Sequence, residues 1–272
     1  MIPRVLTVAG SDSGGGAGIQ ADIKTITSMR GFATSVIVAL TAQNSQEVLG
    51  IRPLDTDFIE KQMDAVLSDI GTDSAKTGML YSSEIIRSVT KKFREYDVTN
   101  IVVDPVMISK SGAELLKGEA VNELVNGLGR ISELITPNIP EAEKISGISI
   151  KDKDDMIQVA ENIRDLTGAS ILVKGGHSAD PESTDILCTD SGITEIKGKR
   201  VFTKNTHGTG DTYSSAIATN LAYGLDLVTS VRRARAYLQV AIENSFPMGK
   251  GYGALCHFCN SRQVSDEGLQ QI

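Results

Sequence analysis

The sequence contains no tryptophan, three cysteines and three histidines in 272 residues, and aromatic residues make up only 4% of it. Three cysteines are too few for a disulfide framework, so they suit a reducing compartment. No apolar run approaches the length of a membrane-spanning helix, and the first residues lack the apolar stretch of a signal peptide. We therefore expect a cytoplasmic protein without a membrane partner.

Basic charge is also scarce. Lys and Arg number 27 against 34 Asp and Glu, which gives a formal net charge of −7. The tightest basic cluster, Arg232, Arg233 and Arg235, lies on a predicted amphipathic helix beside an apolar stripe that would face the core. A surface for nucleic acid is therefore not expected.

Cysteine and histidine come close together in Cys256-His257-Phe258-Cys259. This segment could supply three ligands to zinc. A structural zinc site normally uses a second ligand pair, and His177, His207 and Cys188 do not lie in paired motifs. A metal site is therefore the less favoured interpretation of this segment.

Apolar strand-like segments alternate with amphipathic helical ones, which predicts an α/β protein with a mostly parallel sheet covered on both faces. The hydrophobic content of 40% is enough for a large core, and without a visible linker we expect one domain over residues 1–272. Near the end of the sheet, short segments separated by glycines predict an antiparallel meander at its edge. The predicted strands are Val5–Ala9, Ser35–Leu40, Ser74–Thr77, Ile101–Val103, Leu134–Thr136, Ile171–Lys174, Asp185–Thr189, Ile193–Ile196 and Arg200–Phe202, and the predicted helices are Gly18–Met29, Asp57–Ser68, Ser83–Glu95, Glu119–Leu128, Asp154–Leu166, Thr209–Tyr223 and Leu227–Phe246.

Glycine is concentrated where the first predicted strand ends, with five glycines in the nine residues from Gly10 to Gly18. Ligands bind at the carboxyl ends of parallel strands, and glycine lets the backbone approach them closely. Asp12 and Asp22 add carboxylates that accept from N–H or O–H groups, so the composition suits a neutral or amine-bearing ligand. The alternative is a tight turn whose glycines serve packing alone.

This turn does not match the common phosphate-binding patterns. A Walker A loop needs lysine and then serine or threonine after its last glycine, whereas Ile19 follows Gly18. A dinucleotide fingerprint needs another glycine spacing and an acidic residue after the next strand, where this chain has Thr41-Ala42-Gln43-Asn44.

Polar residues also follow later predicted strands. Asp104 stands where a buried strand emerges, and Pro105 stops that strand. Glu141 begins a short helix, where an acidic residue is commonly a partner of the helix dipole. Lys174 lies at another strand end beside two glycines, although on its own it would be a surface lysine.

The segment Gly208-Thr209-Gly210-Asp211 directly precedes a long apolar helix. Its glycines allow backbone N–H groups to converge at the helix N-terminus and form an anion hole for phosphoryl oxygens. Asp211 would then accept the proton of an attacking hydroxyl. The alternative role for Asp211 is an N-cap, which stabilises a helix by about 1 kcal/mol.

Taken in order, these motifs resemble the hydroxymethylpyrimidine/phosphomethylpyrimidine kinases of thiamin synthesis, a branch of the ribokinase superfamily. The resemblance covers nearly the whole chain and implies a three-layer α/β/α fold, a small-molecule pyrimidine substrate, ATP as co-substrate, Mg²⁺ and a homodimer. The segments that carry it are Ala9-Gly10-Ser11-Asp12-Ser13 to Asp22, Ala39-Leu40-Thr41-Ala42-Gln43-Asn44, Lys76-Thr77-Gly78-Met79-Leu80, Asp104-Pro105-Val106, Thr136-Pro137-Asn138, Lys174-Gly175-Gly176-His177 and Gly208-Thr209-Gly210.

The resemblance also assigns roles to individual residues. The carboxamide of Gln43 would read a ring nitrogen beside an exocyclic amine, and Asp22 would accept from the hydroxymethyl or amine group. Asp104 and Glu141 would hold Mg²⁺, partly through water. The full substrate set is Gly10, Asp12, Asp22, Gln43, Met79 and Val106, with the last two as apolar walls; ATP would be positioned by Asn138, Lys174, Thr209 and Gly210, and the catalytic set is Asp211, Gly208, Thr209, Gly210 and Lys174.

The chain departs from many members of this branch at one position. They carry cysteine after Gly-Thr-Gly, whereas this chain has Asp211, as do ribokinase and the pyridoxal kinases of the wider superfamily. A pyridoxine or pyridoxal kinase is therefore the alternative function. A non-catalytic ligand sensor that keeps the fold is less favoured, because the anion-hole glycines, the magnesium carboxylates and the base are all present.

Overall fold

One sheet runs through the part of the chain that the computed structural model describes, residues 2–108, 112, 115–116, 120–177 and 182–259. Its nine strands lie in the order β3-β2-β1-β4-β5-β6-β7-β8-β9. The strands from β2 to β7 are parallel, while β3 at one edge and β8 and β9 at the other run antiparallel to their neighbours. The strands are β1 (Arg4–Asp12), β2 (Phe32–Gln43), β3 (Val48–Pro53), β4 (Ser74–Thr77), β5 (Ile101–Val103), β6 (Leu134–Ile135), β7 (Ser170–Val173), β8 (Glu182–Thr189) and β9 (Gly192–Lys199).

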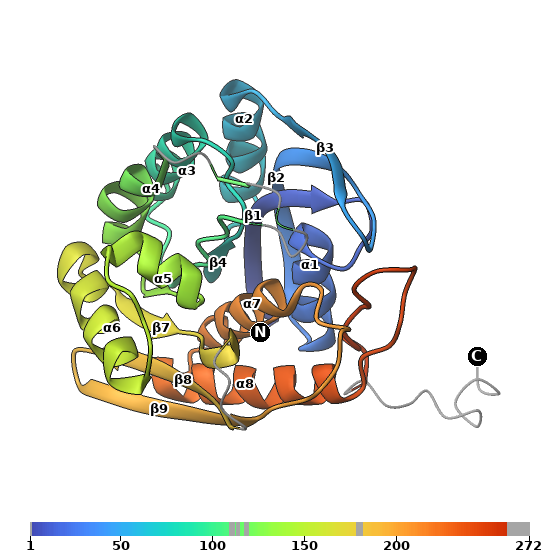
Figure 1. The fold of residues 1–272 in the computed structure, drawn as a ribbon. Coiled ribbons are helices and arrows are strands. Elements are labelled where there is room, and N and C mark those ends of the chain that lie inside the picture. Colours follow the sequence, from blue (N-terminus) through green and yellow to red (C-terminus); the bar gives the residue numbers. More distant parts are fainter. Residues whose placement is uncertain (1, 109–111, 113–114, 117–119, 178–181, 260–272) are drawn as a thin grey trace.

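Helices cover both faces of the sheet, which confirms the predicted three-layer α/β/α fold (Figure 1). Successive side chains of a strand point to opposite faces, so Val5 packs with one apolar cluster and Leu6 with the other. One face is covered by α1 (Gly18–Ser28), α7 (Thr209–Ala222) and α8 (Leu227–Glu243). The other is covered by α2 (Thr56–Leu67), α3 (Ser83–Glu95), α4 (Ala120–Glu123) with the π-helical turn Leu124–Leu128, α5 (Ile139–Ser146) and α6 (Lys153–Thr167).

Several helices begin where a capping side chain satisfies the first free backbone N–H groups. Asp55 accepts from the amide of Phe58 before α2, and Asp226 accepts from the amide of Thr229 before α8, both at 2.9 Å. Such side chains replace the missing intrahelical acceptors of the first turn. These local signals explain why the predicted starts of α2 and α8 agree with the structure to within one residue.

Two strand predictions at the sheet edges are wrong. β3 was not expected, because its side chains are all at least partly exposed and give no apolar alternation. The predicted strand Arg200–Phe202 is not formed; Phe202 is 91% exposed and the antiparallel pairing ends at Lys199. The first residue of the predicted helix Glu119–Leu128 lies outside the described residues.

The Cys256–Cys259 segment does not form the zinc site that the sequence analysis considered and did not favour. The structure joins Cys256 and Cys259 in a disulfide, so their sulfurs are not metal ligands, and this local bond is a difference from the reduced cysteines that the composition favours. His257 lies between them with its Nε2 2.9 Å from the hydroxyl oxygen of Thr212. Among the described residues, no group of three or more His, Cys, Asp or Glu could hold a metal ion.

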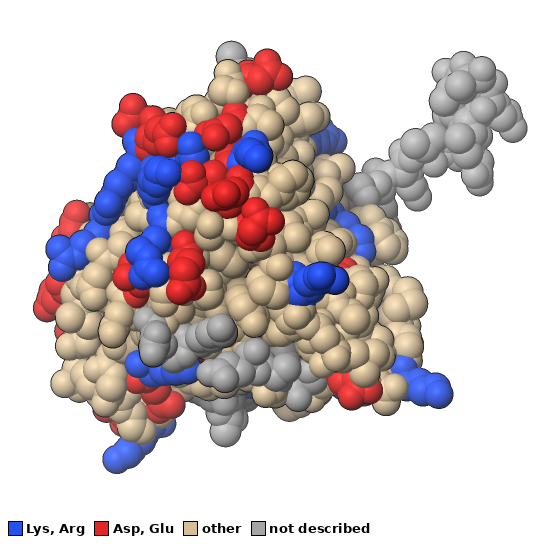
Figure 2. Space-filling view, turned by 90° about the horizontal axis from the view of Figure 1, so that it is seen from above, with Lys and Arg blue, Asp and Glu red and all other residues tan. Residues whose placement is uncertain are grey.

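Charges of both signs are interspersed over the α2–α3 side of the molecule, which Figure 2 shows from above. Lys91 pairs with Glu60, Lys92 with Asp64, and Arg87 contacts Glu123. Alternating signs give this face no extended basic field for a polyanion. Within the described residues, no helix is both long and apolar enough to span a bilayer.

Candidate active site

A cavity of about 610 Å³ opens at the carboxyl ends of the parallel strands, beside the N-terminus of α7. Parallel strands collect their following loops at one edge, which brings together motifs that are far apart in the sequence. Every predicted site residue except Asp22 lines this cavity. The lining includes Gly10, Asp12, Gln43, Met79, Asp104, Val106, Asn138, Glu141, Lys174, Gly208, Thr209, Gly210 and Asp211.

Asp12 holds the first glycine-rich turn in shape. Its Oδ1 accepts from the amide of Gly14 at 2.8 Å, and its Oδ2 accepts from the amides of Gly16 and Ala17 at 3.0 and 2.9 Å. Burial opposes ionisation of this carboxyl, but the contact with His207 and these amides outweigh it and lower its pKa. Asp12 therefore lies at the cavity wall with its oxygens engaged by the turn, and not only as a free acceptor for a ligand.

The first glycine-rich turn packs directly against the second. A Cβ atom on Gly208 would lie 1.9 Å from the carbonyl oxygen of Gly16, and Gly208 has the positive φ of 80° that favours glycine. Gly208 is also the N-cap residue of α7, so Asp211 is the third residue of that helix. The N-cap alternative for Asp211 is therefore wrong.

Gln43 lies at the end of β2, next to His207, for which the sequence analysis predicted no role. His207 Nε2 is 2.9 Å from Asp12 Oδ2 and 3.4 Å from Gln43 Nε2, while Thr41 Oγ1 is 3.2 Å from Gln43 Oε1. His207 Nε2 therefore donates to the carboxylate of Asp12 in the first turn, and the carboxamide nitrogen of Gln43 lies beside it. His207 and Asp12 are 195 residues apart in the sequence. Only the position of His207 just before Gly-Thr-Gly could have indicated that this histidine lies at the site.

Met79 forms part of the apolar wall, and Gly10 makes room for it. A Cβ atom on Gly10 would lie 2.4 Å from the terminal methyl carbon of Met79, so a larger residue at position 10 would displace the methionine. Met79 is buried, and the half-buried Val106 lies on the same cavity lining. These two side chains give this part of the cavity wall an apolar surface.

Asp104, Lys174 and Glu141 form a buried charged cluster deeper along the lining. Lys174 Nζ lies 2.7 Å from Asp104 Oδ1, so this lysine is not the surface lysine that its segment alone would suggest. Burial raises the pKa of Glu141 to about 7, and for Lys174 the neighbouring carboxylates outweigh burial and raise its pKa. Glu141 also forms a capping box with Asn138 at the start of α5, with both hydrogen bonds at 2.8 to 2.9 Å. Glu141 therefore caps the start of α5 and also lines the cavity.

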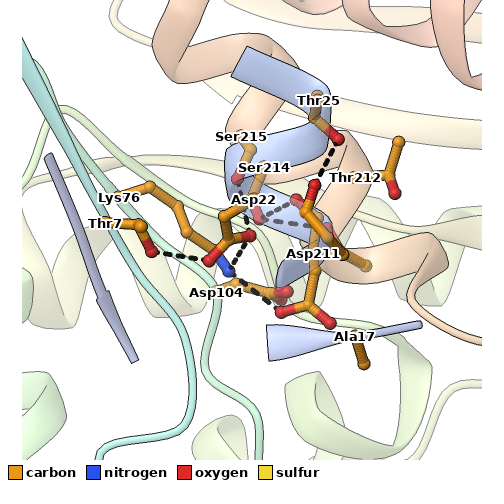
Figure 3. Close-up of polar contacts among 12 residues, drawn as sticks. Thr7, Ala17, Asp22, Thr25, Lys76, Asp104, Asp211, Thr212, Ser214 and Ser215 are labelled. Atoms are coloured by element: carbon orange, nitrogen blue, oxygen red, sulfur yellow. Dashed lines mark hydrogen bonds and ion pairs between the residues drawn. The ribbon is translucent and has the colours of Figure 1, made fainter. Parts of the chain in front are cut away.

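Asp22 does not lie on the cavity but behind it. It is fully buried and accepts from Thr7 Oγ1 at 2.6 Å, Ser215 Oγ at 2.7 Å and Lys76 Nζ at 2.8 Å (Figure 3). The expected direct contact of Asp22 with a substrate does not agree with this placement, because the first residues of α1 turn it toward the core. Its neighbour Lys76 is also fully buried, and it contacts Asp211, which does line the cavity.

Lys76 also donates to Asp211 Oδ1 at 2.9 Å, so one ammonium joins the two carboxylates (Figure 3). Burial alone would raise the pKa of Asp211, but the charge and hydrogen bond of Lys76 outweigh it and hold that pKa below its usual range. Asp211 is therefore ionised at neutral pH and faces the cavity with 14% of its side chain exposed. A lysine in the middle of the buried strand segment Ser74–Thr77 was the sequence signal for such a network.

Comparison with known proteins identifies the family. The model of the phosphomethylpyrimidine kinase family matches residues 12–256. A hydroxymethylpyrimidine/phosphomethylpyrimidine kinase of Bacillus subtilis is 42% identical over 262 residues, covering 96% of this chain and 97% of that protein. A thiamine biosynthesis bifunctional protein of Geobacter sulfurreducens is 46% identical, but the chain spans only 54% of its length.

A solved structure with the same fold is the ADP complex of Bacillus subtilis pyridoxal kinase, with a TM-score of 0.90 and 33% identity. The match covers 97% of this chain and 100% of that one. The family model, the Bacillus subtilis kinase and this solved structure each match most of the chain. The chain belongs to the phosphomethylpyrimidine kinase family.

Proposed function

We propose that this chain is an ATP-dependent kinase that phosphorylates 4-amino-5-hydroxymethyl-2-methylpyrimidine and its monophosphate, giving the diphosphate used in thiamin synthesis. One observation carries the proposal: a single cavity holds a carboxamide, Gln43, and an ionised carboxylate, Asp211, at the N-terminus of α7. The first suits the aminopyrimidine edge and the second suits a hydroxyl or phosphate nucleophile.

In the first transfer, Asp211 accepts the proton of the substrate hydroxymethyl group as its oxygen attacks the γ-phosphorus of ATP. The bond from that phosphorus to the β,γ-bridging oxygen breaks, and ADP leaves. The backbone N–H groups at the start of α7, around Thr209 and Gly210, hold the charge on the transferred group. Lys174 supplies a positive charge at the phosphates, and Asn138 lies on the same part of the lining.

Asp104 and Glu141 fit Mg²⁺. Both carboxylates are buried at the cavity wall, and a Cβ atom on Gly210 would lie 3.0 Å from Asp104 Oδ2, so this oxygen faces the anion hole. Two oxygen donors suit a cation that keeps much of its water and shares phosphate oxygens. When bound, Mg²⁺ would neutralise charge on the β- and γ-phosphate oxygens.

Pyridoxal phosphorylation is the second candidate function, and Asp211 favours it because the resembling pyridoxal kinases carry aspartate at this position. Steady-state ADP release with Mg-ATP should be measured for the hydroxymethylpyrimidine, its monophosphate and pyridoxal in parallel. We expect a higher kcat/KM for the hydroxymethylpyrimidine than for pyridoxal, because Gln43 offers the paired donor and acceptor that an aminopyrimidine needs. A preference for pyridoxal would reject the first function, and no turnover of any of them would favour the ligand sensor.

A Gln43→Leu variant should lose discrimination between pyrimidine and pyridoxal. Leucine keeps the bulk but leaves the polar edge of the pyrimidine unpaired, which costs about 1–3 kcal/mol, or roughly 5–150-fold in kcat/KM. The measurement is the ratio of kcat/KM for the two substrates. Gln158→Leu is the matched control, because Gln158 is exposed on α6 and lies outside the cavity lining. An unchanged ratio in Gln43→Leu would show that another group reads the ring.

The homodimer and the cytoplasmic location that the resemblance and composition imply stay predictions. The oligomeric state can be measured by sedimentation of the purified chain in solution with and without Mg-ATP.

A further inference from the structure

Lys76 is a charged side chain in the core of the sheet. It lies on β4 with 0% exposure, and each residue of that strand is buried. Removing an ammonium group from water costs free energy, and close partners of opposite charge must offset that cost. Lys76 has two, Asp22 on α1 and Asp211 on α7, at 2.8 and 2.9 Å. Three elements that are distant in sequence therefore meet at one nitrogen atom.

The two carboxylates differ in what else they contact. Asp22 is held by the hydroxyls of Thr7 and Ser215 and has no exposed surface. Asp211 borders the cavity and keeps 14% of its side chain exposed. Asp22 thus fixes the ammonium from the core side, and the ammonium fixes one oxygen of Asp211 on the cavity side.

Packing leaves the ammonium little freedom to move elsewhere. A Cβ atom on Gly78 would lie 3.0 Å from Lys76 Nζ and 3.6 Å from Asp211 Oδ1, so backbone closes the network on that side. Ser215 is one helical turn beyond Asp211 on α7, and both point toward Lys76 and Asp22 (Figure 3). Rotation of α7 or withdrawal of Asp211 would break contacts at two points of the same helix.

Stability alone does not account for this arrangement. Apolar side chains of similar volume often replace a buried ion pair without loss of stability, and here one ammonium faces two carboxylates. What the network supplies is a fixed position for Asp211 and a cation beside it. We propose that Lys76, with Asp22 as its counter-carboxylate, is a positioning residue that holds Asp211 in the orientation and the ionised state needed to accept the substrate proton. The proposal rests on the role of Asp211 in the proposed function.

The groups around Asp211 support the statement that Lys76 favours its ionised form. Burial raises the pKa of Asp22 to about 6 and would raise that of Asp211 too, yet Lys76 holds the pKa of Asp211 below its usual range. The other charged or titratable groups facing this network are Asp104 after β5, Lys174 after β7, His207 before α7 and His257 after α8. Of these groups, Lys76 makes the direct hydrogen bond to Asp211.

The test compares Lys76→Met with Lys76→Met/Asp22→Asn. The single variant leaves two buried carboxylates without their cation, whereas the double variant returns the network to its original net charge of −1, since it keeps only Asp211. We expect the single variant to be destabilised and the double variant to recover most of its melting temperature. In both, kcat should fall about 10²-fold, the cost of misplacing a reacting group, with a smaller change in KM for either substrate.

A pH profile gives a readout that folding does not move. A base must be ionised, so kcat falls as pH drops through its pKa, and loss of Lys76 should move this acidic limb to higher pH. The matched control is Lys92→Met, because Lys92 is also a buried lysine between two carboxylates, Asp64 and Glu95, but lies outside the cavity lining. It should lower the melting temperature and leave kcat and its pH profile unchanged.

Recovery of kcat together with melting temperature in the double variant would overturn the proposal, since Lys76 would then be structural only. Wild-type turnover is measured first with the better of the three substrates, so a wrong substrate assignment does not affect the comparison. A low kcat in Asp211→Asn with a wild-type kcat and pH profile in the Lys76 variants overturns this proposal alone. A wild-type kcat in Asp211→Asn overturns it together with the proposed base.

Discussion

An Asp211→Asn variant is expected to fold like the wild-type chain and to lose roughly 10²–10⁴-fold in kcat, the usual contribution of a positioned general base. Asparagine keeps the size of aspartate but cannot take the hydroxyl proton. Folding should hold because Gly208, and not Asp211, is the N-cap of α7, and because Asp22 remains to neutralise Lys76. Steady-state kcat and a thermal melt on the same preparation test both statements.

Asp211→Cys sharpens this experiment, since it recreates the residue that many members of the family carry. The ammonium of Lys76, 2.9 Å from the present carboxylate, favours a thiolate at this position. The cysteine variant should therefore retain more activity than the asparagine variant. If the asparagine variant kept a near-normal kcat and lost only thermal stability, phosphoryl transfer would depend on the anion hole, Lys174 and Mg²⁺ without a base.

A Gly208→Ala variant should lose at least about 10²-fold in kcat/KM and some stability. The new methyl group would lie 1.9 Å from the carbonyl oxygen of Gly16, so the two glycine-rich turns must separate. A displacement of about 1 Å in an active site is enough for such a loss. The positive φ of 80° adds strain of about 1–3 kcal/mol for a residue with a side chain.

Gly224→Ala separates these two effects. Gly224 has a φ of +78°, but a Cβ atom there would meet no atom within 4 Å. It carries the backbone strain without the collision and lies at the far end of α7. The control should lower the melting temperature and leave kcat/KM unchanged; equal loss of activity in both variants would mean that strain in α7, and not the contact between the turns, controls the site.

The sequence was most informative where a segment is buried on both sides or begins with a local signal. β5 and α3 have the predicted bounds, because β5 is a buried run of three apolar residues and α3 begins after the capping residue Ser82. β4 also has the predicted bounds, although three of its four residues are polar or charged. β3 was not predicted, because an exposed edge strand needs no run or alternation of apolar residues. The glycine-rich turns also predicted the position of the cavity, because the loops that follow parallel strands all lie at one edge of the sheet.

The sequence was least informative about contacts between distant side chains. Asp22 carries the right charge near the right turn, but its partner Lys76 is 54 residues away, and Lys76 and Asp211 are 135 apart. Helix periodicity shows that Asp22 shares a face with the buried Ile19 and Ile26, yet it cannot show what that face meets. Whether a charged residue that faces the core binds a ligand or stabilises another side chain depends on the partner that it meets there.

The contact between Gly16 and Gly208 also bears on how the protein matures during synthesis. The ribosome completes β1 and its turn early, and β2 and β4 can pair with β1 soon afterwards. The other side of this contact is translated 192 residues after Gly16, since it begins at Gly208. A nascent chain therefore gains most of its sheet before the proposed nucleotide site is complete, and a ligand of that site can stabilise the fold only after most of the polypeptide has emerged.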